Sequence, residues 1–148
     1  MPVRLGDLLS AVREYDENYR SAKMGKLEIS EPYDMAPEKG ETRIPCDGKW
    51  PDMWPYASRA GIYAFIDKNL EVVYVGKASL RSTLGARVSS YCGYATDRSC
   101  QMYHRWTSLP RYLVTVAVPE DTPFEAPALE EFLISKLQPN ENSTGIVR

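Results

Sequence analysis

The stretch from Gly61 to Gly76, GIYAFIDKNLEVVYVG, constrains the fold more than any other part of the chain. Two runs of apolar and β-branched residues flank the turn-forming residues 67–69 (Asp-Lys-Asn), and this pattern predicts a β-hairpin. The hairpin opens with a Gly-hydrophobe-Tyr triplet that ends at Tyr63 and closes with a Tyr-hydrophobe-Gly triplet that begins at Tyr74. A hairpin needs neither triplet, so the two tyrosines are candidates for a functional site.

Apolar periodicity predicts the elements around this hairpin. One helix is expected over residues 82–91, with Ser82 or Thr83 as its N-cap, and a second over 97–106, capped by Asp97. The other expected elements are an N-terminal helix over residues 3–20, a strand over 111–118 and a C-terminal helix that ends near Leu137. Together they predict an α+β fold, a three-stranded antiparallel or mixed sheet flanked by helices.

The start of the C-terminal helix has two candidate positions. Thr122 and Glu125 stand at the spacing of a capping box, whereas Pro127 does not fit the interior of a helix. We therefore expect the helix to begin near Pro127. Five of its apolar residues are expected to face the core: Leu129, Phe132, Leu133, Ile134 and Leu137.

The segment from about Ile29 to Ala57 lacks helical or strand periodicity and is rich in proline. We expect an irregular arm that lies over the core and is anchored by Trp50 and Trp54. A connection this long is often functional, for example as a substrate-binding arm. The expected organisation is therefore an N-terminal helix and arm, residues 1–57, packed on a second region, 58–148, as one structural unit.

Composition excludes several classes of protein. The chain has 148 residues, of which 43% are hydrophobic and 26% charged, as in an ordinary globular domain. No apolar run approaches the roughly 20 residues that span a bilayer, and the charged N-terminus does not resemble a signal peptide. We therefore expect a cytoplasmic protein that does not bind membranes.

Charge is distributed unevenly along the chain. The formal net charge is −2, yet residues 77–111 carry a balance of +5, which leaves −7 for the remainder. The cations of this block are Lys77, Arg81, Arg87, Arg98, Arg105 and Arg111, against the single acid Asp97. The block is either a local phosphate-binding face or a solvated helical surface, and charge alone does not decide between them.

The three cysteines, Cys46, Cys92 and Cys100, form no C-x-x-C pair. A metal site could recruit all three together with His104, the only histidine, but their spacing matches no zinc-finger or zinc-ribbon template. We expect buried, reduced thiols instead.

Several motifs occur together in an informative order. The segment YVGKASLRSTLGARVSSY carries Lys77, Arg87 and Tyr91, and LEEFLISKLQPNEN carries Glu130 and Asn142. With the two tyrosine triplets, these motifs resemble the GIY-YIG nuclease family over residues 60–142, and most closely the nuclease domain of the bacterial excision-repair nuclease. The segment SLRSTLG looks about three residues longer than in that family. Arg87, unlike Arg81, is followed by V-S-S-Y, so Arg87 is the better counterpart of the family arginine.

The resemblance implies roles for these residues. It assigns one divalent metal, Mg²⁺ or alternatively Mn²⁺, to Glu130, and the general base to Tyr63, with Lys77 and the metal lowering the phenol pKa. Tyr74 would orient the water or the phosphate. Arg87 would stabilise the transition state, and Tyr91 would share its helix face. Asn142 would tie the catalytic loop to the site.

The function implied by the resemblance is hydrolysis of phosphodiester bonds in DNA, and the same phosphate chemistry would also accept RNA. We expect four arginines to contact the nucleic acid: Arg81, Arg98, Arg105 and Arg111. The alternative is a nucleic-acid-binding or regulatory module that keeps the fold without catalysis. A recognition sequence, the number of strands cut and the oligomeric state leave no signal in the sequence.

Overall fold

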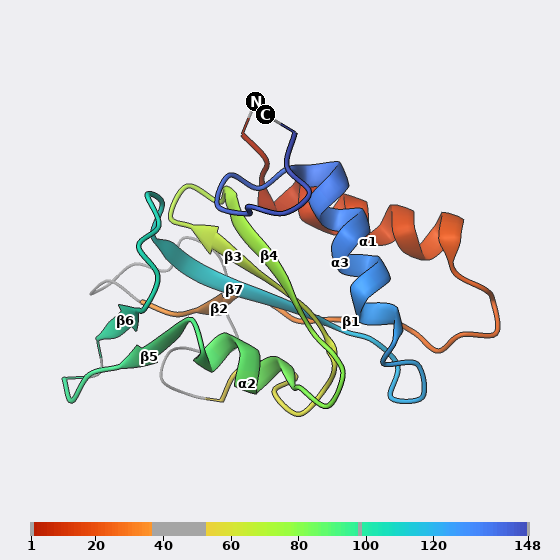
Figure 1. Cartoon of the computed structure of the whole chain (residues 1–148), viewed down its shortest axis with the longest axis horizontal. Coiled ribbons are helices and arrows are strands. Elements are labelled where there is room, and N and C mark those ends of the chain that lie inside the picture. The colour runs from red at the N-terminus through yellow and green to blue at the C-terminus, as the bar shows by residue number, and fades with distance from the viewer. Residues whose placement is uncertain (1, 37–52, 98, 148) are drawn as a thin grey trace.

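The computed structural model describes residues 2–36, 53–97 and 99–147 of the chain (Figure 1). The described helices are α1 (Leu5–Tyr19), α2 (Leu84–Ser89) and α3 (Glu125–Leu137). The described strands are β1 (Glu28–Ile29), β2 (Tyr33–Asp34), β3 (Gly61–Asp67), β4 (Val72–Ala78), β5 (Cys92–Tyr94), β6 (Cys100–Met102) and β7 (Pro110–Ala117).

The main sheet is antiparallel throughout and confirms the α+β prediction. Its strand order is β1-β7-β3-β4, and β2 also pairs with β7. The three strands expected from the sequence form its centre. The two short strands β1 and β2 correct the expectation of a wholly irregular segment after residue 29, because both take their backbone partners from β7.

Both faces of the sheet are covered, and every residue of β3 is buried as a result (Figure 1). Ile62, Ala64 and Ile66 point to one face, where they pack with the helices α1 and α3. Tyr63 and Phe65 point to the other face, which is covered by α2 and the β5–β6 hairpin. Because successive residues of a strand alternate between faces, a sheet covered on both sides is apolar along its whole central strand.

The helix expected over residues 97–106 is wrong, because β5 and β6 form a small hairpin there. Asp97 does not cap a helix. Its carboxylate instead accepts hydrogen bonds from Ser99, at 3.0 Å from the amide and 2.6 Å from the hydroxyl, which closes a turn. The cap predicted at Thr83 is confirmed by a 3.2 Å bond from the Ala86 amide, but α2 ends at Ser89 rather than near Tyr91.

The helix α3 begins at Glu125, two residues before the expected start near Pro127. Pro127 occupies the third position, where the missing N–H costs nothing because the first amides of a helix have no partner within it. Leu129, Leu133, Ile134 and Leu137 are buried as expected, and most of them face α1 or the sheet. Phe132 is only partly buried and packs its ring against Tyr15 and Tyr19 of α1.

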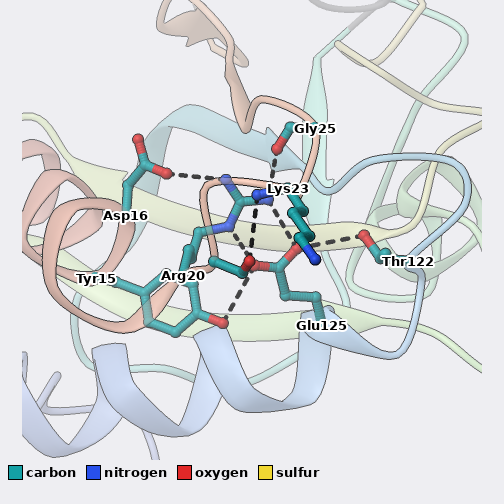
Figure 2. Close-up of polar contacts among 8 residues, drawn as sticks. Tyr15, Asp16, Arg20, Lys23, Gly25, Thr122 and Glu125 are labelled. Carbon is teal, nitrogen blue, oxygen red and sulfur yellow. Dashed lines mark hydrogen bonds and ion pairs between the residues drawn. The ribbon is translucent and has the colours of Figure 1, made fainter.

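A buried ion pair joins the end of α1 to the start of α3 (Figure 2). The Arg20 guanidinium donates to both oxygens of Glu125, and the bond from Nη2 to Oε2 measures 3.1 Å. Tyr15 Oη and Thr122 Oγ1 donate to the same carboxylate at 3.3 and 3.4 Å. Burial and the Glu125 charge raise the pKa of Tyr15 to about 12. The contact therefore holds α1 against the sheet-covering helix.

The arm returns to the core at Trp54, as expected. Its ring packs on Tyr33 of β2 at 5.4 Å, and its Nε1 donates to Ser89 Oγ of α2 at 3.0 Å. Trp50, the second expected anchor, and Cys46 lie outside the described residues.

Candidate active site

The two tyrosines of the hairpin lie on the same face of the sheet. Tyr63 pairs with Gly76, and Phe65 pairs with Tyr74, so Tyr63 and Tyr74 share the face that α2 covers. Their ring centroids are 6.3 Å apart. Tyr91 approaches from the chain that follows α2, and its hydroxyl lies 2.8 Å from that of Tyr74. Three phenols therefore converge beside the β4 edge of the sheet.

Close packing explains the glycines of the two triplets. A Cβ at Gly76 would lie 2.4 Å from the hydroxyl oxygen of Tyr63, and a Cβ at Gly61 would lie 2.0 Å from the carbonyl oxygen of Val116. The sequence suggested that these glycines admit a backbone or a phosphate. At Gly76 it is the ring of Tyr63 that needs the space, and at Gly61 it is the backbone of β7.

Tyr63 is a buried phenol without a conventional partner. Its side chain is 0% exposed, and its hydroxyl makes no hydrogen bond to any residue that the structure describes. Burial raises the pKa of Tyr63, Tyr91 and Tyr74 raise it further, and the charge of Arg87 lowers it. The expected lowering by Lys77 is not found, because burial dominates and Arg87 is the cation that acts. Tyr63 is thus a neutral phenol in the protein alone.

Arg87 is exposed on α2 and faces the tyrosine cluster. The proximity of Tyr63 raises the pKa of this guanidinium, with smaller contributions of the same sign from Tyr91 and Tyr74. The side chain is therefore a permanent positive charge beside the phenols, with its fork open to solvent. Such a group can bind a phosphate.

Glu130 approaches the cluster from α3, on the other side of the β4 edge. Its side chain is partly buried and makes no hydrogen bond or ion pair within the described parts of the chain. Burial raises the pKa of Glu130, whereas the charges of Lys77 and Arg87 lower it and Glu131 raises it. The Glu130 charge in turn raises the pKa of Tyr74. The carboxylate thus lies within electrostatic reach of both cations and of one phenol.

Lys77 extends from β4 on the face that α3 covers, because it pairs with Ile62. Its ammonium donates to Ser79 Oγ at 3.2 Å. Lys77 and Arg87 therefore bracket the β4 edge from opposite faces of the sheet, and Glu130 feels both charges.

Asn142 fastens the chain after α3 to this edge. Its side-chain amide accepts from the Val75 amide and donates to the Val75 carbonyl, both at 2.9 Å. The pair imitates one step of a β-ladder on the exposed side of β4. It also forms one wall of an open cavity of about 610 Å³, whose lining includes Tyr74, Glu130 and Glu131.

The donor set beside this cavity suits a hard cation. No group of three or more histidine, cysteine or acidic residues that could hold a metal occurs in the part of the chain that the structure describes. Cys92 and Cys100 are free thiols. Glu130 is the partnerless carboxylate, and Mg²⁺ is commonly held by one or two carboxylates while it keeps several waters and substrate phosphate oxygens. The residues therefore fit Mg²⁺ or Mn²⁺ and do not resemble a structural zinc site.

The structure separates the four arginines that were expected to contact nucleic acid. Arg81 and Arg105 are exposed, and Arg81 has a positive φ of 73° in the loop after β4. Arg111 is 5% exposed and faces Asp34 at 3.5 Å, so this geometry keeps it from a phosphate. Arg98 lies outside the described residues.

Sequence reasoning missed two rings of the site. Trp106 stacks on Tyr74 with a centroid distance of 5.0 Å, and His104 stacks on Tyr91 at 4.5 Å. The available signal was the Tyr-His-Arg-Trp run at 103–106, in which aromatic and cationic residues alternate. The expected helix over 97–106 concealed it.

Comparison with known proteins gives one positive result. The family model of the UvrC-like GIY-YIG domain matches residues 59–143, which confirms the resemblance seen in the sequence. No curated protein and no solved structure gives a significant match. No described helix is long and apolar enough to cross a membrane.

Proposed function

This chain belongs to the UvrC-like GIY-YIG family, and from that premise we propose that it is a metal-dependent endonuclease that hydrolyses phosphodiester bonds in DNA. Domains of this family are typically endonucleolytic, generally use a divalent metal and act on DNA. The observation that carries the proposal is Glu130: a partly buried carboxylate without a partner among the described residues, within electrostatic reach of two cations and a phenol.

Glu130 would hold the Mg²⁺ or Mn²⁺ ion beside the cavity. When bound, the ion supplies a Lewis acid for the phosphoryl group and lowers the pKa of a coordinated water. Water and phosphate oxygens fill the remaining ligand positions, so the ion binds weakly until DNA arrives. Lys77 keeps Glu130 ionised, because its positive charge lowers the pKa of that carboxyl against the effect of burial.

The three phenols position and deprotonate the attacking water. Tyr63 acts as general base and accepts the water proton. Because burial raises its pKa, its phenolate needs a cation beside it, and Arg87 already acts in that direction. Tyr74 orients the water, and the hydroxyl of Tyr91 fixes the Tyr74 hydroxyl from 2.8 Å away.

Arg87 stabilises the negative charge that develops on the phosphate in the transition state. Its planar fork can hold two phosphate oxygens at once. Asn142 acts through Val75, by holding the chain after α3 against β4. The exposed Arg81 and Arg105 contact the DNA backbone. Residues 1–57 form one unit with 58–148, which the pairing of β1 and β2 with β7 supports.

Nicking of supercoiled plasmid tests the proposal. The protein should nick in Mg²⁺ or Mn²⁺ and stop in EDTA, while DNA binding, measured by gel shift in EDTA, persists. A protein that binds DNA but nicks in neither metal is not a nuclease, and the alternative function then holds.

That alternative is a nucleic-acid-binding module without catalysis. One observation favours it: Tyr63, the proposed base, is a fully buried phenol whose pKa is raised. A pure binding module would tolerate Glu130→Gln and Tyr63→Phe without any change in its function. The nuclease would not.

A further inference from the structure

Four aromatic rings form a continuous stack that leads from the candidate site to the surface. Tyr74 stacks on Trp106 at 5.0 Å with 25° between the ring planes. Trp106 stacks on His104 at 5.7 Å and 23°. His104 in turn stacks on Tyr91 at 4.5 Å and 30°, and the Tyr91 hydroxyl returns to Tyr74. The stack therefore begins at the proposed catalytic hydroxyls.

The outer end of the stack is open to solvent. His104 is exposed although its ring lies against Tyr91, and Trp106 is only partly buried. The β5–β6 hairpin supports both rings from below, since the Tyr103 amide donates to the Tyr91 carbonyl at 2.8 Å. An imidazole held flat on a phenol, with its surroundings open, presents a preformed planar surface.

Positive charge flanks this surface. Arg105 lies between the two rings in the sequence and is exposed, and Arg87 is exposed beside the neighbouring tyrosines. Aromatic rings for bases together with cations for the backbone are the combination that binds unpaired nucleic acid, because every base has a flat face regardless of its identity. A base inside an intact duplex is stacked on both sides and cannot use such a surface.

We propose that His104 and Trp106 form a platform on which an unpaired base next to the scissile phosphate stacks, so that the protein prefers DNA with unpaired nucleotides over intact duplex. The inference rests on the proposed function, because it names the kind of DNA that the same site accepts. The platform binds and positions the substrate and takes no part in the chemistry.

Binding in EDTA isolates this property from cleavage. Fluorescence anisotropy compares a labelled single-stranded oligonucleotide with the duplex of the same sequence, and 2-aminopurine placed in a gap reports stacking by quenching. We expect the wild-type protein to bind the single strand more tightly and to quench the gap base. His104→Ala should weaken single-strand binding about tenfold, the loss typical of one stacked base, with duplex binding changed less than about twofold.

Two further variants make the result specific. His104→Phe keeps a flat ring and should retain most of the single-strand affinity and the quenching. Tyr19→Ala removes an exposed ring, 66% accessible, from α1 and should change neither. Circular dichroism checks that each variant is folded.

The proposal is overturned if His104→Ala leaves the ratio of single-strand to duplex affinity unchanged, if Tyr19→Ala lowers that ratio equally, or if the wild-type protein fails to favour unpaired DNA. These outcomes are distinct from failure of the nuclease proposal. A protein that nicks plasmid in Mg²⁺ without a His104 effect refutes only the platform. A protein that quenches the gap base but nicks in no metal refutes only the nuclease.

Discussion

Two glutamates of α3 differ in everything except their helix. Glu125 is 4% exposed and its carboxylate receives hydrogen bonds from Arg20, Tyr15 and Thr122 (Figure 2). Glu130, five residues further along, is partly buried and has no such partner within the described residues, and burial raises its pKa. One carboxylate has its lone pairs filled by the protein, and the other does not.

The difference teaches which acid holds the fold and which is available to a ligand. A buried charge with a full set of donors is costly to disturb, because removal of either partner leaves the other unpaired. A partly buried carboxylate without donors is destabilising by itself and is relieved when a cation binds. We therefore assign structure to Glu125 and propose metal binding for Glu130.

The largest expected effect on stability is at the paired glutamate. Glu125→Ala should lower the free energy of unfolding by about 3–5 kcal/mol, because it leaves the buried Arg20 without its counter-ion. Urea denaturation followed by circular dichroism measures the change. Glu130→Ala is the matched control on the same helix and should cost far less. Equal losses at the two positions would break the comparison.

A second contrast concerns the arginines that belong to these two regions. Arg87→Ala should slow nicking by about 10²–10³-fold at unchanged stability, since its fork stabilises the developing charge on the phosphate. Arg87→Lys should recover only part of the rate, because it keeps the charge and loses the fork. Initial nicking rates in Mg²⁺ measure both. A fully active Arg87→Ala protein would remove Arg87 from the site.

Packing at the site should prove as tight as in the core. Gly76→Ala places a Cβ 2.4 Å from the Tyr63 hydroxyl oxygen and should cost about 1–3 kcal/mol of stability. Gly6→Ala in α1, where a Cβ meets nothing within 4 Å, should stabilise the protein by up to about 1 kcal/mol. Thermal unfolding distinguishes the two signs. A neutral Gly76→Ala would mean that the Tyr63 ring moves freely.

The smallest expected effect is the pH dependence at Glu130. Its raised pKa means that the folded protein holds this proton more tightly than the unfolded chain does, so the resulting stability is present below the ordinary value of 4.5 and is lost as the pH rises through the raised pKa. Glu130→Gln should therefore be slightly more stable than the wild-type protein at neutral pH in EDTA. The advantage should vanish below that ordinary value, and an advantage that persists there would contradict the assignment.

Local pattern was sufficient for much of the fold. The β3–β4 hairpin, the strand β7, the Thr83 cap and the buried residues of α3 all follow from spacing and turn chemistry within a few residues. Strands of two residues carry no such pattern, and β1 and β2 exist only because β7 offers them partners. Asp97 can close a turn as well as cap a helix, and only the β5–β6 pairing decides between the two.

The candidate site shows the same division. The residue types came from resemblance, and register explains why Tyr63 and Tyr74 share a face. The raised pKa of Tyr63 depends on α2 and the hairpin that cover it, which the sequence does not reveal. The burial of Arg111 depends on Asp34, which lies on the distant strand β2. Contacts between segments far apart in the chain were what sequence reasoning missed.

Plasmid nicking by Glu130→Gln and Glu125→Gln, side by side in Mg²⁺ at a temperature where both are folded, tests the central claim most directly. Each change removes one carboxylate charge from the same helix and keeps nearly the same shape. We predict that Glu130→Gln loses at least about a thousandfold in rate, as expected when several kcal/mol of metal assistance is lost. Glu125→Gln should keep most of its rate per folded molecule. Retained Mg²⁺-dependent nicking by Glu130→Gln would contradict the account.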